Sequence, residues 1–329
     1  MEQTISPDTV DELHAGFQSL REEIGKVIVG QDEIIRQIFV SMICRGHVLL
    51  VGVPGLAKTL LIHTISDAID LTFSRIQFTP DLMPSDITGT EIIEEDATTG
   101  RRQFKFVKGP VFASVVLADE INRTPPKTQA ALLEAMQEHR VTAAGQTFAL
   151  PEPFFVLATQ NPIEQEGTYP LPEAQLDRFM FNLWLDYPTF DQEVDIVRQT
   201  TSGARPDKKH VLAAADIQRF QELIRQIPVA DNVIEYAVRL VNKTRPAGDL
   251  APQFVKDYIS YGAGPRASQY LILGAKASAA LEGRLTPSID DVNRIAVSVL
   301  RHRIVTNFNA EADGVSGVDV INRMLESAV

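Results

Sequence analysis

The 329-residue sequence contains a single cysteine and no long hydrophobic run. Because a disulfide or a cysteine metal cluster needs more than one thiol, Cys44 excludes both within one chain. No stretch approaches the roughly 18 apolar residues that cross a bilayer, so we expect no membrane insertion. The first residues show no basic segment followed by an apolar core, so no secretory signal is predicted. These absences favour a cytoplasmic protein.

Positive charge is also scarce, since 31 lysines and arginines stand against 43 aspartates and glutamates, a net charge of -12. A protein that holds nucleic acid mainly through phosphate contacts needs the opposite balance, so nucleic acid is not an expected partner. The composition is otherwise that of a folded globular protein, with 44% hydrophobic and 22% charged residues. The length suggests about two domains.

Short apolar runs alternate with helical patterns over the first 185 residues. The predicted strands are 47–51, 72–78, 111–118, 154–159 and 179–185, and the predicted helices are 31–44, 58–69 and 127–139. This alternation is typical of an α/β fold, with a mostly parallel sheet sandwiched by helices.

The pattern changes from Thr189 onward, where β-rich runs disappear and apolar residues recur at helical spacing. The predicted helices are 213–227, 233–241, 268–281 and 292–300, with a loop at 201–209. Pro188 disfavours helix in the residue before it. We therefore expect an α/β domain over 1–188 and a small all-helical domain over 189–329.

Two segments predict β-hairpins inserted into the α/β domain. Residues 91–94 and 103–107 flank the turn-like segment 97–100, and residues 141–150 carry Gly145 near their middle. Spacing alone leaves open whether the hairpins do more than decorate the edge of the sheet.

A glycine-rich loop directly follows the first predicted strand and opens a helix. Its residues are Gly52, Val53, Pro54, Gly55, Leu56, Ala57, Lys58 and Thr59. Such a loop points several backbone N–H groups at one phosphate chain, and the helix N-terminus adds positive partial charge. Lys58 is placed to reach the β- and γ-phosphates of ATP, and the Thr59 hydroxyl to bind Mg²⁺. Ala57 replaces the usual last glycine, so we expect its φ to be negative.

Polar residues follow the third and fourth predicted strands, 111–118 and 154–159. Asp119 is expected to hold Mg²⁺, and Glu120 to accept a proton from the water that attacks the γ-phosphate. Adjacent strand residues point to opposite sides, which allows the two acids separate roles; the alternative is a solvated acidic pair. Asn161 either orients the attacking water or forms the turn that the dipeptide Asn161-Pro162 favours.

The order of these motifs resembles that of AAA+ ATPases, with the glycine-rich loop as Walker A and the Asp-Glu pair as Walker B. Segments 117–123, 125–129, 158–162 and 171–179 resemble the MoxR family in particular, and the resemblance covers roughly residues 8–325. Ala57 is no departure within this family, whose loop typically ends Ala-Lys-Thr. The resemblance implies a P-loop sheet followed by a helical lid.

The resemblance adds residue roles that spacing does not supply. Gly30 and Gln31 match the segment near the adenine. Arg178 matches an arginine finger that reaches the nucleotide of a neighbouring subunit; the alternative is a surface arginine paired with Asp177. Arg266 matches the second sensor, placed against the γ-phosphate; the alternative is a helix-terminal arginine that meets only solvent.

The function that the resemblance implies is Mg²⁺-dependent ATP hydrolysis by a hexameric ring, coupled to chaperone-like remodelling, maturation or metal insertion of partner proteins. It also implies a partner with a von Willebrand factor A domain, and a first hairpin that faces the centre of the ring. A nucleic-acid motor or loader is one alternative, against which the net acidity counts. A nucleotide-dependent scaffold with little turnover is another, against which Glu120 and Arg178 count. The sequence does not identify the client.

Overall fold

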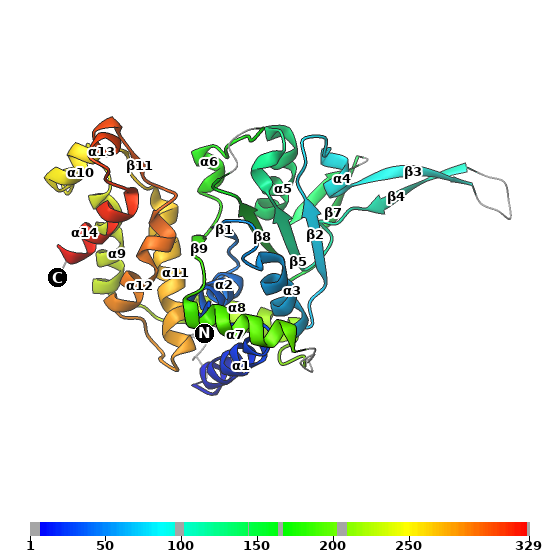
Figure 1. Ribbon diagram of the computed structural model, residues 1–329, viewed down its shortest axis with the longest axis horizontal. Helices are drawn as coiled ribbons and strands as arrows, with labels where there is room; N and C mark the ends of the chain where they lie inside the picture. The colour runs from blue at the N-terminus through cyan, green and yellow to red at the C-terminus, as the bar shows by residue number, and fades with distance from the viewer. Residues whose placement is uncertain (1–6, 96–101, 144, 164–166, 203–208, 328–329) are drawn as a thin grey trace.

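Five parallel strands form the central sheet of the molecule (Figure 1). The computed structural model describes residues 7–95, 102–143, 145–163, 167–202 and 209–327. The strands are β1 (Val48–Gly52), β2 (Phe73–Gln77), β5 (Val115–Asp119), β8 (Phe155–Gln160) and β9 (Phe181–Leu185), and they lie in the order β2-β5-β8-β1-β9. The predicted parallel α/β sheet is confirmed.

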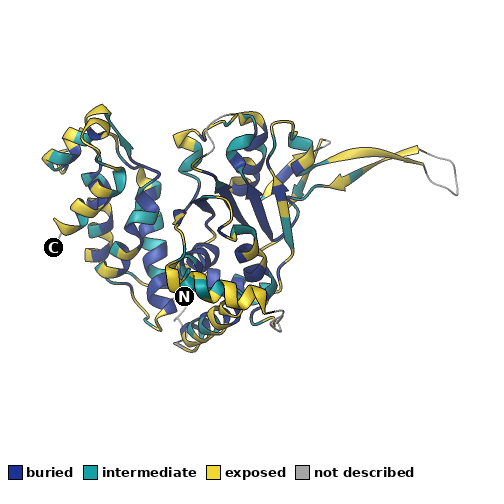
Figure 2. Cartoon of the chain, viewed as in Figure 1, coloured by how far each residue is buried: buried dark blue, intermediate teal, exposed yellow. Residues whose placement is uncertain are grey.

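Helices cover both faces of this sheet, so its inner strands are continuous apolar runs rather than alternating ones. Leu50 and Leu117 belong to the hydrophobic cluster on the face of α1, α2 and α3, whereas Leu49 and Val116 belong to the cluster on the face of α5. The helices of this part are α1 (Pro7–Gly25), α2 (Asp32–Ile43), α3 (Lys58–Ala68), α4 (Pro84–Thr88), the 3₁₀ turn η1 (Ile121–Arg123), α5 (Pro126–Glu138) and α6 (Glu173–Leu176). Figure 2 shows the buried strands at the centre.

A second group of helices lies beside the sheet in Figure 1. It contains α9 (Asp231–Lys243), α10 (Gln253–Tyr258), α11 (Pro265–Leu281), α12 (Ile289–Leu300), α13 (Phe308–Ala312) and α14 (Gly317–Glu326). The helical lid is confirmed, with one correction: β10 (Ile259–Tyr261) and β11 (Val305–Thr306) form a short antiparallel pair within it. Gly274 of α11 allows α12 to approach, since an added Cβ would lie 2.4 Å from Cδ1 of Ile295.

Two helices connect the strand β9 to the lid. These are α7 (Phe190–Thr201) and α8 (Ala214–Gln226), and both lie with the α/β part (Figure 1). α8 contacts α1 and α2 as well as α11. We propose a division near residue 188, with α7 and α8 as the connection that packs back on the α/β part. None of the helices among the described residues is both long and apolar enough to span a bilayer.

Both predicted hairpins are present. β3 (Gly89–Glu95) and β4 (Arg102–Lys108) form an arm that extends far from the body (Figure 1), with Ile93 opposite Phe104. Phe104 is 73% exposed. β6 (Arg140–Ala143) and β7 (Gln146–Ala149) form the second. The predicted turn 97–100 and most of the predicted loop 201–209 lie outside the described residues.

His47, just before β1, is a buried histidine whose two ring nitrogens both have backbone partners. Its Nδ1 accepts a hydrogen bond from the Val156 N–H (3.0 Å), so its Nε2 carries the proton and donates to the Met136 carbonyl (3.2 Å). Burial disfavours the charged ring and lowers the pKa of His47 from 6.5 to about 4. The folded protein therefore holds this ring neutral.

This histidine makes stability depend on pH. Because its folded pKa lies below its unfolded pKa, its contribution is complete above pH ~6.5 and is lost as the pH falls toward 4. From pH 7.5 to 5 we expect the free energy of unfolding to fall by about 2 kcal/mol through His47 alone. Urea unfolding at both pH values checks this. His47→Gln should lose the share that comes from His47 and keep the share of His302, whose pKa burial also lowers well below its usual value, whereas the exposed His210→Gln should behave as wild type. Equal losses in wild type and His47→Gln would contradict the assignment.

Candidate nucleotide site

The glycine-rich loop joins the end of β1 to the start of α3 by a sharp turn. Gly55 has φ +87° and open space where a Cβ would stand, and Gly52 lies so close to Leu185 that an added Cβ would be 3.0 Å from that side chain. The expected negative φ of Ala57 is wrong, since its φ is 54°. Ala57 is the residue that turns the chain into α3, and it takes the left-handed conformation there despite the steric cost of its Cβ.

This loop lines a cavity of about 440 Å³ at the carboxyl ends of the strands. The lining residues are Pro54, Gly55, Leu56, Ala57, Lys58, Thr59, Leu60, Asp119, Glu120 and Asn161. β8 lies between β1 and β5 in a parallel sheet, so the segments after all three strands meet at one edge. The three predicted motifs therefore form one site, with Gly52 and Val53 just before the cavity.

Lys58 is the first residue of α3, and its Nζ donates a hydrogen bond to the Gly52 carbonyl at 2.5 Å. The ammonium group thus folds back over the loop and bonds to its first residue. The N-terminus of α3 directs unsatisfied N–H groups and positive partial charge at the same place. Lys58 and the helix end together suit the loop to an anionic ligand.

The two carboxylates have separate sets of partners. Asp119 is 8% exposed; its Oδ1 accepts from Thr159 Oγ1 at 2.6 Å and its Oδ2 from Arg75 Nη2 at 2.6 Å. Glu120 Oε2 accepts instead from Gln77 Nε2 at 2.9 Å and Arg123 Nη1 at 3.0 Å.

The predicted reason for this separation needs correction. β5 ends at Asp119, and Glu120 already has a left-handed backbone with φ 57°. The two side chains diverge because the chain leaves the strand between them, not because of the alternation within a strand.

Sequence reasoning missed the residues that hold these carboxylates, namely Arg75, Gln77, Arg123 and Thr159. Gln77 is paired with Asp119 in the register of β2 and β5, and Thr159 lies near the end of β8. The available signal was a polar residue near the end of each strand that neighbours β5, but strand order is needed to recognise it.

Asn161 is buried and forms the turn that its sequence favours, since its Oδ1 accepts from the Ile163 N–H at 3.1 Å. It also lines the cavity beside Glu120. Its turn-forming role is confirmed, and a role toward water stays a prediction.

The residues at the cavity suit a magnesium ion that is bound together with phosphate. The Thr59 hydroxyl and the Asp119 carboxylate both line it and offer the oxygen donors that Mg²⁺ prefers. Mg²⁺ in such sites uses one or two protein groups and takes its other ligands from phosphate and water. In the described part of the chain, no group of three or more His, Cys, Asp or Glu residues is placed to hold a metal ion.

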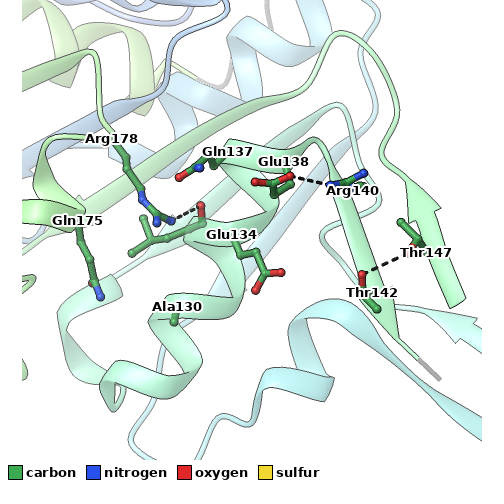
Figure 3. Close-up of a pocket in the computed structure, with 10 residues that line it drawn as sticks. Ala130, Glu134, Gln137, Glu138, Arg140, Thr142, Thr147, Gln175 and Arg178 are labelled. Carbon is green, nitrogen blue, oxygen red and sulfur yellow. Dashed lines mark hydrogen bonds and ion pairs between the residues drawn. The ribbon is translucent and has the colours of Figure 1, made fainter. Parts of the chain in front are cut away.

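Arg178 lies away from this cavity. Its Nη1 donates to the Leu133 carbonyl of α5 at 2.7 Å, and it lines a separate hollow of about 620 Å³ between α5, α6 and the β6–β7 hairpin (Figure 3). The alternative of a pair with Asp177 is wrong, because that carboxylate binds Arg266 (2.7 Å) and Arg303 (2.8 Å).

Arg266 lies with Arg178, not with the glycine-rich loop. Both arginines line a hollow of about 190 Å³, together with Arg45 and Tyr270. Among the described residues, the sets that line this hollow and the loop cavity have no member in common. The structure thus brings the two predicted arginines together and separates both from the loop of their own chain.

Gly30 and Gln31 precede α2, and both have left-handed backbones, with φ 71° and 63°. The positive φ of Gly30 favours glycine at this position, and an added Cβ would lie 2.6 Å from Nε2 of the Gln192 side chain on α7. Neither residue lines the loop cavity, and their role toward a base stays a prediction.

Sequence comparison matches two family models to the chain. The ATPase family associated with various cellular activities (AAA) matches residues 47–181, and the AAA lid domain matches residues 253–324. The first contains the loop, the two carboxylates, Asn161 and Arg178, and the second contains Arg266.

Several known proteins are similar over nearly the whole chain. Chaperone MoxR1 of Mycobacterium tuberculosis is 46% identical over 93% of this chain and 80% of its own, and protein MoxR of Paracoccus denitrificans is 29% identical over 90% of each. A crystal structure of a protein described as an ATPase, from Cytophaga hutchinsonii, has a TM-score of 0.90 and 40% identity over 97% of this chain and 96% of its own.

Proposed function

Because the chain belongs to the MoxR family of AAA ATPases, we propose that it hydrolyses MgATP between neighbouring copies and uses the cycle to remodel partner proteins. ATPase activity and a chaperone-like role follow from the family. The observation that carries the proposal is the separation of the loop cavity from the hollow that holds Arg178 and Arg266. A site divided in this way is complete only when two copies meet.

Within one chain, the loop cavity holds the nucleotide. The N–H groups at the start of α3 and the Lys58 ammonium bind the phosphates, and Lys58 exchanges its contact with the Gly52 carbonyl for them. Thr59 and Asp119 hold the magnesium ion, which neutralises charge on the phosphates when bound. Gly30 and Gln31 lie toward the base.

The acid–base step belongs to Glu120. Gln77 and Arg123 hold one oxygen of its carboxylate, which leaves the other to accept a proton from water. Asn161, which lines the same cavity, helps to place that water. Asp119, tied to Arg75 and Thr159, keeps its place at the metal.

Further positive charge at the γ-phosphate comes from the next copy. Arg178 acts as a finger on the neighbour's γ-phosphate, and Arg266, beside it, acts on the same phosphate rather than on that of its own chain. A head-to-tail contact forms a ring when its rotation closes, and we propose a closed ring of six subunits.

The proposed action on partner proteins is based on the family. The Mycobacterium tuberculosis relative is named a chaperone, and we propose that this protein remodels or matures partners, including insertion of a metal cofactor. We further propose a partner with a von Willebrand factor A domain, and work in the cytoplasm.

Lys58→Ala tests the nucleotide site. We expect it to keep its fold and to lose MgATP affinity roughly 100-fold, the effect of about 3 kcal/mol of charged hydrogen bonds. Titration with a fluorescent ATP analogue measures the change, and the matched control is Lys256→Ala on α10 in the lid. Wild-type affinity in a folded Lys58→Ala protein would refute the site.

A further inference from the structure

The backbone around Arg178 is held by side chains from the helical lid. Each carbonyl of residues 177–180 accepts a hydrogen bond from a lid side chain: Asp177 O from Arg303 Nη2 (2.9 Å), Arg178 O from the Tyr270 hydroxyl (3.4 Å), Phe179 O from Arg303 Nη2 (2.6 Å) and Met180 O from Arg303 Nη1 (3.2 Å). The lid therefore binds the segment that carries the finger at every residue.

Arg303, which follows α12, is the centre of this contact. Its side chain is only 1% exposed, and a buried charge is costly unless it is paired and hydrogen-bonded. Its Nε donates to Asp177 Oδ1 at 2.8 Å, and its guanidinium lies 5.2 Å from the centre of the Tyr270 ring. A guanidinium with five N–H donors in a fixed plane can hold several carbonyls and a carboxylate at once, which the lysine ammonium cannot.

Asp177 joins this buried arginine to the hollow that faces a neighbour. Its Oδ2 accepts from Arg266 Nη1 at 2.7 Å, while its Oδ1 binds Arg303. Asp177 also immediately precedes Arg178 in the chain. Asp177 thus ties Arg266 to the segment that carries Arg178, and both of these arginines line the same hollow.

From these contacts we propose that Asp177 and Arg303 are positioning residues that lock the finger segment to the lid, so that Arg178 and Arg266 reach the neighbour's nucleotide as one unit. The inference rests on the proposed function, because it assigns these residues to the side of the interface that donates charge. A displacement of the lid is then carried directly to the finger.

Asp177→Asn is the variant that separates positioning from folding. The amide has the shape of the carboxylate but a single acceptor oxygen. It can still accept from Arg303, whereas its NH₂ group repels the Arg266 guanidinium. We expect kcat to fall about 10-fold from misplaced charge, with the MgATP affinity of the variant's own pocket within about 2-fold of wild type.

The activity of mixed variants distinguishes a positioning role from a merely structural one, because a merely structural defect would not depend on which variant it is mixed with. Asp177→Asn has an intact pocket and a defective donor side, so mixing it with Lys58→Ala should raise activity above the sum of the two. Mixing it with Arg178→Ala should give no such rise, because both are defective on the same side. The matched control is Asp195→Asn, which also removes a carboxylate paired with an arginine (Arg198, 3.2 Å) but on exposed α7, and which should behave as wild type.

The single tryptophan reports whether the junction is intact. Trp184 on β9 lies 4.7 Å from the guanidinium of Arg301, two residues before Arg303. If Asp177→Asn loses the native tryptophan emission, Tyr270→Phe is tested in its place. This variant removes only the hydroxyl that donates to Arg178 O, and we expect kcat to fall about 3-fold. In the mixing experiments it should behave as Asp177→Asn is expected to.

Two results would overturn the inference. The first is a wild-type kcat in Asp177→Asn, or in Tyr270→Phe if that variant is used instead. The second is a rise in activity when the same variant is mixed with Arg178→Ala, or a loss of MgATP affinity in its own pocket as large as its loss of kcat. If Arg178→Ala and Lys58→Ala fail to complement each other, the shared site fails and this inference with it; if they complement and Asp177→Asn does not follow Arg178→Ala, only the inference fails.

Discussion

Glu120→Gln should bind MgATP almost as wild type does and hydrolyse it at least about 100-fold more slowly, the contribution of a general base. The amide keeps an oxygen that can accept from Gln77 and Arg123, the partners of the carboxylate. It cannot accept a proton from water at neutral pH. Phosphate release under steady-state conditions measures turnover, and titration with a fluorescent ATP analogue measures binding.

Asp119→Asn is the matched comparison, because it makes the same chemical change one residue away. Its amide cannot balance Arg75, which donates to the carboxylate at 2.6 Å, and it is a weaker ligand for Mg²⁺. We expect this variant to lose the magnesium dependence of nucleotide binding. Equal loss of binding in both variants, or turnover kept in both, would show that the two carboxylates do not divide the work in this way.

Arg178→Ala should bind ATP in its own pocket nearly normally, yet hydrolyse it about 100-fold more slowly, somewhat less than the ~10³–10⁵ of fingers in GTPases. The reason is that Arg178 lines a hollow on α5 and not the loop cavity. In the proposed ring its charge therefore acts on the nucleotide of another copy. Steady-state phosphate release measures the turnover of this variant alone, and nucleotide titration measures its ATP affinity.

Mixing Arg178→Ala with Lys58→Ala tests the shared site directly. The first variant has an intact pocket and the second an intact finger, so mixed rings contain some complete sites and activity should exceed the sum. The control is Arg178→Ala mixed with the double variant Arg178→Ala/Lys58→Ala, which supplies neither part. Labelled protein must first show that subunits exchange. With exchange proven, no rise in activity would favour a monomeric nucleotide switch over a ring enzyme.

The chemistry of the nucleotide site could be predicted from the sequence because its parts are local. Gly52 to Thr59 form a strand end, a turn and a helix start within eight residues, and the strands before Asp119 and Asn161 are apolar runs that end in polar residues. A parallel sheet brings such ends to one edge whatever the order of its inner strands. Composition and these motifs were therefore enough to predict the α/β fold and most of the residues that line the cavity.

The partners of these groups depend on packing that spacing does not contain. Arg75 meets Asp119 only because β2 pairs with β5, and the φ of Ala57 is decided by the turn into α3. Arg266 and Arg303 reach Asp177 across 89 and 126 residues. Hydrophobic periodicity marks the buried face of each lid helix but not which neighbour that face meets. The tertiary structure alone brought Arg266 of the lid to the same hollow as Arg178, apart from the cavity that the glycine-rich loop lines.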